Sequence, residues 1–176
     1  QMLKGVLAGL EAACSANVGV KINVVVQRNL NEGEVLPIAR FGKNLGIPVR
    51  FIEFMDVGNH NQWDRGKVVP SVEILEKLVG EIQLEPIESA YRGEVAQRYR
   101  EIGGRWEVGL ISSITRPFCK DCVRARLTAD GCLFTCLFAS QSTDLREVLR
   151  TGGDDALMDA ISHAWAKRDD RYSELR

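Results

Sequence analysis

Three of the five cysteines stand at a spacing that suits an inorganic centre. Cys119 and Cys122 are separated by two residues, so a tight turn can direct both thiols at one metal ion or cluster. Cys136 follows Asp130-Gly131, a strong signal for the turn of a β-hairpin. Because the second strand of a hairpin runs back beside the first, we expect Cys136 to meet the Cys119–Cys122 turn.

These residues alone leave more than one kind of site open. An iron–sulfur cluster held by three cysteines keeps one iron free for a small molecule. A structural zinc ion normally takes four protein ligands, and the fourth would be Cys132, His60 or His163. A regular hairpin would keep Cys132 away from the other thiols. Disulfides are disfavoured, because the cysteines are too few and uneven for a secreted scaffold, and we expect Cys14 to be a packing residue.

Basic residues adjoin the cysteine motif. Arg124 and Arg126 share one face if residues 124–128 form a strand, and together they favour an anionic ligand such as a phosphate chain. Lys21 lies in an otherwise apolar strand, on the same face as Asn23, and phosphate is a suitable partner for it. Met55 ends another predicted strand, where parallel α/β folds bind ligands, although simple packing is the default interpretation for it.

The elements that position these residues alternate between helices and short apolar strands, the pattern of a parallel α/β sheet or barrel. Expected strands cover residues 20–26, 49–55 and 107–115. Expected helices begin near residues 3, 31 and 71, the last with Val72, Leu75 and Val79 facing inward, and a short helix is expected within 90–99. A hairpin follows over 124–137, and two closing helices begin near residues 142 and 154.

Composition narrows the class of protein. The chain has 176 residues, of which 45% are apolar and 27% charged, as in a folded globular unit. A formal net charge of −1 gives no general attraction to nucleic acid or to an anionic membrane, and no apolar run reaches the length of a membrane span. Unpaired thiols fit a reducing, cytoplasmic setting. The absence of an initiator Met and of a helix stop at the C-terminus suggests a fragment.

Three stretches carry a family resemblance. They are Lys21-Ile-Asn-Val-Val-Val, Arg50-Phe-Ile-Glu-Phe-Met-Asp-Val-Gly, and the segment from Ile114 through the cysteines and Asp130-Gly131 to Phe138. The third is the most specific, because cysteine spacing, arginine pair and turn occur together. With them the chain resembles the C-terminal part of the GTP 3′,8-cyclase family, radical S-adenosylmethionine enzymes of molybdenum cofactor biosynthesis.

The resemblance implies a fold and a set of roles. The fold would be α/β, the second half of an incomplete (β/α) TIM-like barrel over residues 1–115, with a cysteine-bearing hairpin and closing helices over 116–176. The cysteines at 119, 122 and 136 would hold a C-terminal [4Fe-4S] cluster whose open iron binds the guanine of GTP. Lys21 and the run Arg124-Ala125-Arg126 would bind GTP, and Met55 would contact S-adenosylmethionine.

The sequence also departs from the family. The first [4Fe-4S] cluster, which splits S-adenosylmethionine to the radical that attacks GTP, needs cysteines separated by three and then two residues; after Cys132 and Cys136 the third position is Ala139. We therefore expect a chain that binds GTP without converting it, from an enzyme that is a homodimer at full length. The alternatives are a zinc-stabilised interaction module without enzymatic activity and an electron-relay iron–sulfur module.

Overall fold

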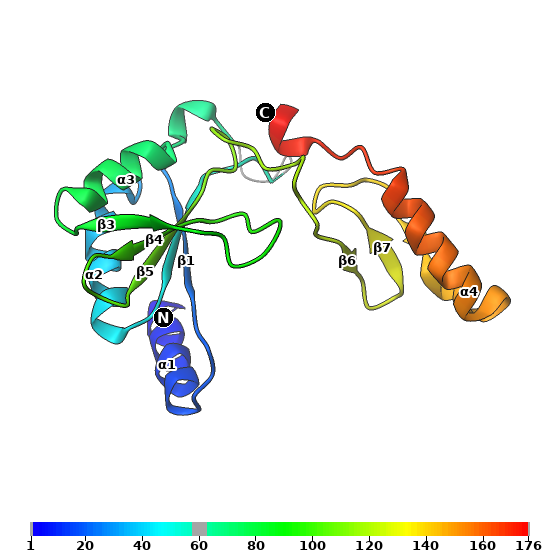
Figure 1. Cartoon of the computed structure of the whole chain (residues 1–176), viewed down its shortest axis with the longest axis horizontal. Coiled ribbons are helices and arrows are strands. Elements are labelled where there is room, and N and C mark those ends of the chain that lie inside the picture. Colours follow the sequence, from blue (N-terminus) through cyan, green and yellow to red (C-terminus); the bar gives the residue numbers. More distant parts are fainter. Residues whose placement is uncertain (1, 58–62, 176) are drawn as a thin grey trace. The chain divides into compact units, whose positions relative to one another are not determined.

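The protein is described by a computed structural model that covers residues 2–57 and 63–175. The chain divides into two compact units (Figure 1). Unit 1 contains the described residues up to Met55 and from Trp63 to Arg116, and unit 2 contains chiefly the residues from Pro117 onward. His60, considered as a zinc ligand, lies outside the described residues.

Unit 1 is built on a five-stranded mixed sheet in the order β1-β2-β5-β4-β3. The parallel strands are β1 (Ile22–Val26), β2 (Val49–Glu53) and β5 (Glu107–Ile111), whereas β4 (Gln97–Glu101) and β3 (Leu84–Ile87) are antiparallel. The α/β class is confirmed. The expected half of a TIM-like barrel is not confirmed, because two antiparallel strands complete the sheet where a βα repeat was expected.

The short helix expected within 90–99 is wrong, since β4 begins at Gln97. Its residues alternate between the two faces of the sheet. Tyr99 is buried in the core, whereas Arg98 and Arg100 form ion pairs with Glu107 on the neighbouring strand. Cross-strand pairing thus decides the conformation of a segment whose own sequence gave a weak signal.

Two helices cover one face of this sheet, α2 (Val35–Leu45) and α3 (Ser71–Val79), as Figure 1 shows. A 3-10 helix, Glu32–Glu34, leads into α2, and Gly46 ends it with a φ of 67°, as expected for a glycine cap. Alternate strand residues pack beneath the helices in one apolar core; its fully buried members include Val26, Val35, Val49, Phe51, Ile74, Leu78, Val108 and Leu110.

The predicted inward face of α3 is wrong in part. Val72 and Val79 are exposed, and the buried residues of this helix are Ser71, Ile74 and Leu78. Both sets repeat at helical spacing, so periodicity alone does not choose between them. The choice is tertiary, because the first helical N–H, from Ser71, donates to the buried carboxylate of Glu53 on β2 (2.8 Å).

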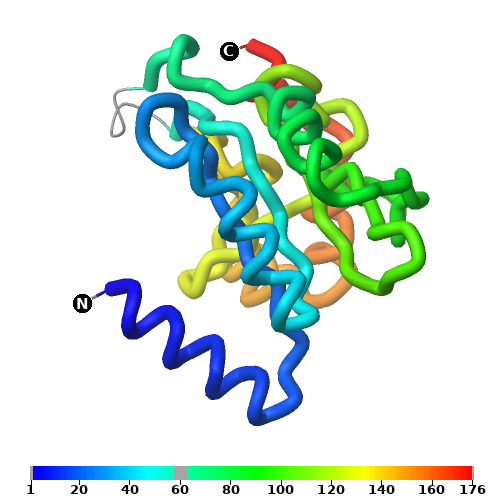
Figure 2. Tube along the Cα trace, turned by 90° about the vertical axis from the view of Figure 1, so that its left-hand side faces the viewer, coloured from blue at the N-terminus to red at the C-terminus, as the bar shows by residue number. Residues whose placement is uncertain are grey.

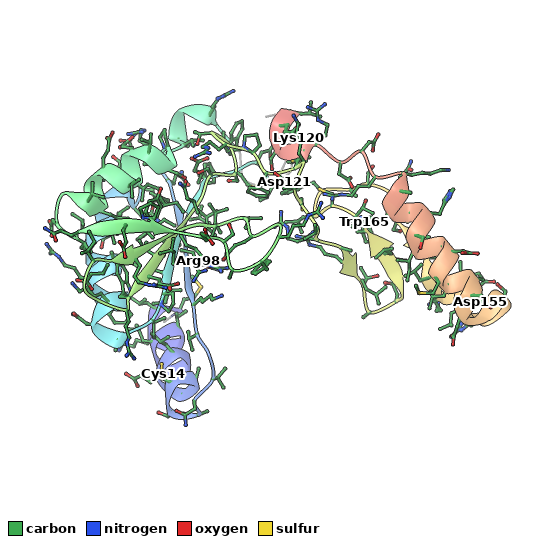
Figure 3. All side chains as sticks on the ribbon, viewed as in Figure 1. Cys14, Arg98, Lys120, Asp121, Asp155 and Trp165 are labelled. Atoms are coloured by element: carbon green, nitrogen blue, oxygen red, sulfur yellow. The ribbon has the colours of Figure 1, made fainter. Side chains whose placement is uncertain are left out.

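The expected N-terminal helix is present as α1 (Met2–Ser15), but it contributes no buried residue to unit 1. Figure 2 shows it at the start of the trace, joined to β1 by residues 16–21. Cys14, expected to pack, is exposed on this helix (Figure 3). Among residues 2–57 and 63–175, no helix combines the length and apolar character that crossing a membrane requires.

Unit 2 is a three-stranded antiparallel sheet in the order β6-β7-β8, with a long helix beside it. The strands are β6 (Arg126–Leu127), β7 (Cys132–Phe134) and β8 (Thr143–Asp144), followed by α4 (Leu145–Ala166) and a 3-10 helix, Tyr172–Leu175. Asp144 caps α4 through the N–H of Glu147 (3.0 Å). The helix breaks at Gly153, where φ is 69°, so two closing helices are confirmed.

Candidate functional site

The Cys119–Cys122 pair lies on a tight turn in unit 2. The N–H of Cys122 donates to the carbonyl oxygen of Cys119 (3.3 Å), which closes the turn. Both cysteines are half-buried, whereas the intervening Lys120 and Asp121 are exposed (Figure 3). A short segment therefore presents two thiols from one loop, as the spacing predicted.

Two arginines surround Cys122. Nε of Arg124 donates to the Cys122 thiol sulfur (3.2 Å), and the same guanidinium lies over the ring of Phe118, 5.0 Å from its centroid. Burial raises the pKa of the Cys122 thiol, but the hydrogen bonds and charge of Arg124, together with Arg168, outweigh burial and hold this pKa below its ordinary value. The thiolate, which is the form that binds metals, is thereby favoured.

The expected hairpin is present, with a different turn. The N–H of Gly131 donates to the carbonyl of Thr128 (3.0 Å), so Ala129 and Asp130 are the central residues. Gly131 follows them with a φ of 87°, which is the left-handed position of a three-residue hairpin loop. Asp130-Gly131 thus marks the turn correctly but is not its two-residue centre.

The paired part of this hairpin is short. Arg126 pairs with Phe134 and Leu127 with Leu133, and β7 ends before Cys136. The thiol of Cys136 accepts a hydrogen bond from the Phe138 N–H (3.5 Å). Regular strand pairing therefore does not carry Cys136 back to the cysteine turn, contrary to the expectation from the sequence.

Cys132 belongs to the ladder near the turn. Its N–H donates to the hydroxyl of Thr128 (3.0 Å), and its thiol donates to Asp130 (3.8 Å). In the described part of the chain, no three His, Cys, Asp or Glu side chains form a group that could hold a metal ion. The convergence of three thiols thus stays a prediction.

The chemistry of the donor set nevertheless fits a thiolate-bound centre. The thiols of Cys119, Cys122 and Cys136 are free and half-buried, and soft thiolates are the ligands of iron–sulfur clusters and of structural zinc. His163, a possible zinc ligand, is an exposed residue of α4. If a cluster binds, these three cysteines are the residues that would hold it.

The predicted shared face of Arg124 and Arg126 does not arise from a strand. Only Arg126 lies in β6, while Arg124 precedes it and turns its guanidinium to Cys122. Ala125 between them is exposed. Both arginines and Ala125 remain within a few residues of the cysteine turn, which is the location that anion binding beside that turn requires.

Lys21 lies in unit 1, immediately before β1, and its side chain is exposed. It lines a cavity of about 100 Å³ together with Arg50, Glu94 and Arg98. Strand register explains this grouping, since Asn23 pairs with Arg50, and Arg50 in turn with Gly109. Lys21, two residues before Asn23, therefore lies on the same face of the sheet as Arg50, opposite the face that α2 and α3 cover.

The site residues predicted from the sequence included neither Arg50 nor Glu94. The Glu94 side chain is only 3% exposed and pairs with Arg50 (3.5 Å) and Arg98 (3.9 Å). Gly109 leaves room for Arg50, because a Cβ at this position would lie 3.2 Å from its Cγ. Matching strand parity between β1 and β2 would have identified Arg50, whereas Glu94 comes from a loop and gave no periodic signal.

Met55 is half-buried just beyond β2. The strand end before it is anchored by Glu53, which is fully buried and accepts hydrogen bonds from the N–H groups of Ser71 (2.8 Å), Ile114 (2.9 Å) and Thr115 (2.8 Å). A buried carboxylate with this many donors fixes the local backbone. Met55 therefore follows a stretch of backbone that is fixed at the carboxyl end of a parallel strand.

Comparison with known proteins extends over nearly the whole chain. Residues 47–174 match the family model described as Molybdenum Cofactor Synthesis C. A GTP 3′,8-cyclase of Acidothermus cellulolyticus is 47% identical over 180 residues, covering 99% of this chain and 50% of the relative. One from Xanthomonas campestris pv. campestris is 47% identical (97% and 50%), and one from Staphylococcus carnosus 43% (97% and 51%).

The chain thus spans about half the length of the curated relatives that it matches. The matched residues 47–174 include the cysteine turn, the arginines beside it, Cys136 and the end of β2. The family model covers well over half of the 176 residues. The chain therefore belongs to the Molybdenum Cofactor Synthesis C family.

Proposed function

We propose that this chain provides the GTP-binding part of a GTP 3′,8-cyclase, which converts GTP to (8S)-3′,8-cyclo-7,8-dihydroguanosine 5′-triphosphate in molybdenum cofactor biosynthesis. Relatives that carry the name GTP 3′,8-cyclase, at 47% identity over almost the whole chain, support the proposal. The structural observation that carries it is the Arg124 guanidinium 3.2 Å from the Cys122 thiol, which joins an anion-binding group to a metal-binding group.

Cys119, Cys122 and Cys136 would hold a [4Fe-4S] cluster. With three thiolate ligands, such a cluster supplies one iron with a free coordination position for an oxygen or nitrogen of guanine. The lowered pKa of Cys122 favours the thiolate, which is the form that binds metal. Free thiols that act as ligands also require a reducing compartment, so we place the protein in the cytoplasm.

The cationic side chains would bind the triphosphate. Arg124 and Arg126 flank Ala125 beside the cysteine turn, and guanidinium groups suit phosphate oxygens in charge and geometry. Lys21 would add a further cation, with Arg50 held beside it by Glu94. Fixing both ends of GTP would orient the ribose for attack, which is the contribution of this chain to the reaction.

Met55 would contact S-adenosylmethionine, from which the radical chemistry starts. The cysteine triplet for the cluster that cleaves this cofactor is not present in the 176 residues. Conversion of GTP would therefore need S-adenosylmethionine and this additional [4Fe-4S] cluster, and the full-length enzyme would act as a homodimer. By itself the chain should bind GTP without converting it.

The test is a GTP titration of the chain after anaerobic reconstitution with iron and sulfide. Replacing Arg124 or Arg126 singly by Ala should weaken GTP binding by about 10-fold or more, as expected for the loss of one charge-assisted hydrogen bond of ~1.5–3 kcal/mol. Arg150→Ala, which removes an equal charge from an exposed position of α4, is the matched control and should leave binding unchanged. Absence of GTP binding by the reconstituted parent would refute the proposal.

Metal analysis separates the proposed centre from a zinc site. The chain should bind iron and inorganic sulfide in equal amounts and lose both on Cys119→Ser, Cys122→Ser or Cys136→Ser. Cys132→Ser is the matched control, because this thiol lies in the hairpin ladder beside Asp130. Stoichiometric zinc without sulfide would instead indicate a structural zinc module.

A further inference from the structure

Arg168, just beyond α4, contacts the cysteine turn. Its guanidinium donates a hydrogen bond to the carbonyl oxygen of Cys122. The guanidinium lies 4.9 Å from the centroid of the Trp165 ring and 3.4 Å from the carboxylate of Asp170. With its side chain only 12% exposed, Arg168 is held in one place by several neighbours. Arg168 therefore holds the cysteine turn in place through the carbonyl oxygen of Cys122.

Tyr172 makes the corresponding contact to the segment of the third cysteine. Its ring stacks on that of Phe138, with centroids 4.0 Å apart and planes 17° from parallel. The N–H of Phe138 donates to the thiol of Cys136. Tyr172 thus supports the residue that orients the Cys136 sulfur.

The C-terminal segment, residues 165–175, consequently contacts both cysteine-bearing segments of unit 2. The hairpin does not provide this connection, because its ladder ends at Phe134. Between the C-terminal segment and residues 135–141 lies a cavity of about 390 Å³, with Cys136 in its wall. Both cysteine-bearing segments therefore contact residues 165–175, and strand pairing does not connect them.

We propose that Arg168 and Tyr172 are positioning residues that set the spacing between the Cys119–Cys122 turn and Cys136. This inference rests on the proposed thiolate centre in unit 2. Neither residue binds GTP; each acts through a cysteine segment that it holds. Because prior ordering of ligands lowers the entropy lost when a cluster binds, removal of either contact should impair retention of the cluster more than it impairs folding.

The experiment compares single variants of the whole 176-residue chain. Arg168→Gln removes the cation and Tyr172→Ala removes the stacked ring, whereas Tyr172→Phe keeps the ring. Arg171→Gln is the matched control, because Arg171 lies in the same segment but is 61% exposed and pairs with Glu174. After anaerobic reconstitution, the measurements are iron per chain, the rate of iron loss to a chelator and the midpoint potential. Circular dichroism checks folding.

Arg168→Gln and Tyr172→Ala should lose iron about 10-fold faster than the parent, the size expected when a group supporting a metal ligand is removed. Arg168→Gln should also shift the midpoint potential, because a cation beside one ligand is lost. Arg171→Gln should match the parent, and Tyr172→Phe, which keeps the stacked ring, should retain iron better than Tyr172→Ala. Folded Arg168→Gln and Tyr172→Ala variants that retain iron like Arg171→Gln would overturn the proposal.

A metal-free measurement keeps this inference separable from the proposed function. In a chain with Cys14, Cys119 and Cys132 replaced by Ser, a short bifunctional thiol reagent can link Cys122 to Cys136. The proportion of linked to singly labelled chain should fall at least severalfold with Arg168→Gln or Tyr172→Ala and not with Arg171→Gln. If the parent chain binds no iron after reconstitution, such a fall would still support Arg168 and Tyr172 as positioning residues while refuting the cluster. An unchanged proportion would refute their positioning role.

Discussion

Unit 1 and unit 2 hold their candidate binding residues by different means. In unit 1 the sheet and two helices bury a continuous apolar core, and the cavity with Lys21 and Arg50 lies on the opposite face of that sheet. In unit 2 the buried apolar residues among those described are Leu133 and Leu145, and Cys119, Cys122 and Cys136 occupy loops. Unit 1 therefore preorganises its site by packing, whereas unit 2 relies on hydrogen bonds, ring stacking and, we infer, its metal centre.

Core truncation should give the largest difference between the units. Phe51→Ala removes a fully buried ring from unit 1 and should lower the free energy of unfolding by about 3–5 kcal/mol. Leu133→Ala, at a 9% exposed position in unit 2, should cost only about 2 kcal/mol because the surroundings can relax. Urea unfolding followed by circular dichroism measures both. Equal losses would contradict the contrast in packing.

Metal binding should affect unit 2 more than unit 1, which is the opposite of the order expected for core truncation. Reconstitution with iron and sulfide should protect residues 117–175 from hydrogen exchange by about 100-fold, which corresponds to ~2.7 kcal/mol when free ligand exceeds its Kd 100-fold. The strands of unit 1 should change little, because their protection comes from the apolar core. Chelation should abolish the effect in unit 2. Protection that rises equally in both units would indicate that the metal stabilises the whole chain.

The pH dependence of Cys122 ionisation should show a smaller effect in unit 2. Since its folded pKa lies below the ordinary thiol value, the thiolate contributes stability above the unfolded pKa, and this contribution disappears as pH falls through the folded pKa. Alkylation of Cys122 in the metal-free chain should therefore persist to lower pH than in an unfolded peptide. Arg124→Ala should move the alkylation midpoint upward; an unmoved midpoint would count against the Arg124 contact.

The edge of unit 1 should give the smallest effect. β1 ends the sheet order and pairs with β2 alone among the described residues, and Val25 on β1 is 48% exposed. An open parallel edge invites pairing with other chains, so we expect the isolated chain to dimerise or aggregate. Val25→Lys should reduce association severalfold in size-exclusion chromatography. A monodisperse parent would contradict this expectation.

Much of the local structure was predictable. Apolar runs correctly indicated β1 and β2, and the two consecutive helices after residue 142 were predicted. Gly46, which ends α2, stands where a glycine cap is common. Each of these signals acts within a few residues along the chain. The cysteine turn was equally accessible, because spacing of two residues is itself a geometric constraint.

Contacts between distant residues were not predictable. Ser71 faces the core in place of Val72, because the backbone N–H of Ser71 donates a hydrogen bond to the side chain of Glu53 on β2. β4 forms because Arg98 and Arg100 find Glu107 on a neighbouring strand. Such long-range partners produce no periodic pattern in the sequence. The weakly amphipathic sequence of β4 is therefore compatible with both a helix and a strand.

The sequence by itself determined the family, the cysteine spacing, the nearby cations and the order of most elements, because these depend on residue type and short separations. Only the tertiary structure decided that the hairpin ladder stops before Cys136, that Arg50 and Glu94 accompany Lys21, and that Arg168 reaches Cys122 from 46 positions away. These contacts depend on strand register and on long-range packing, and both are set by the energy of the whole fold instead of by local propensity.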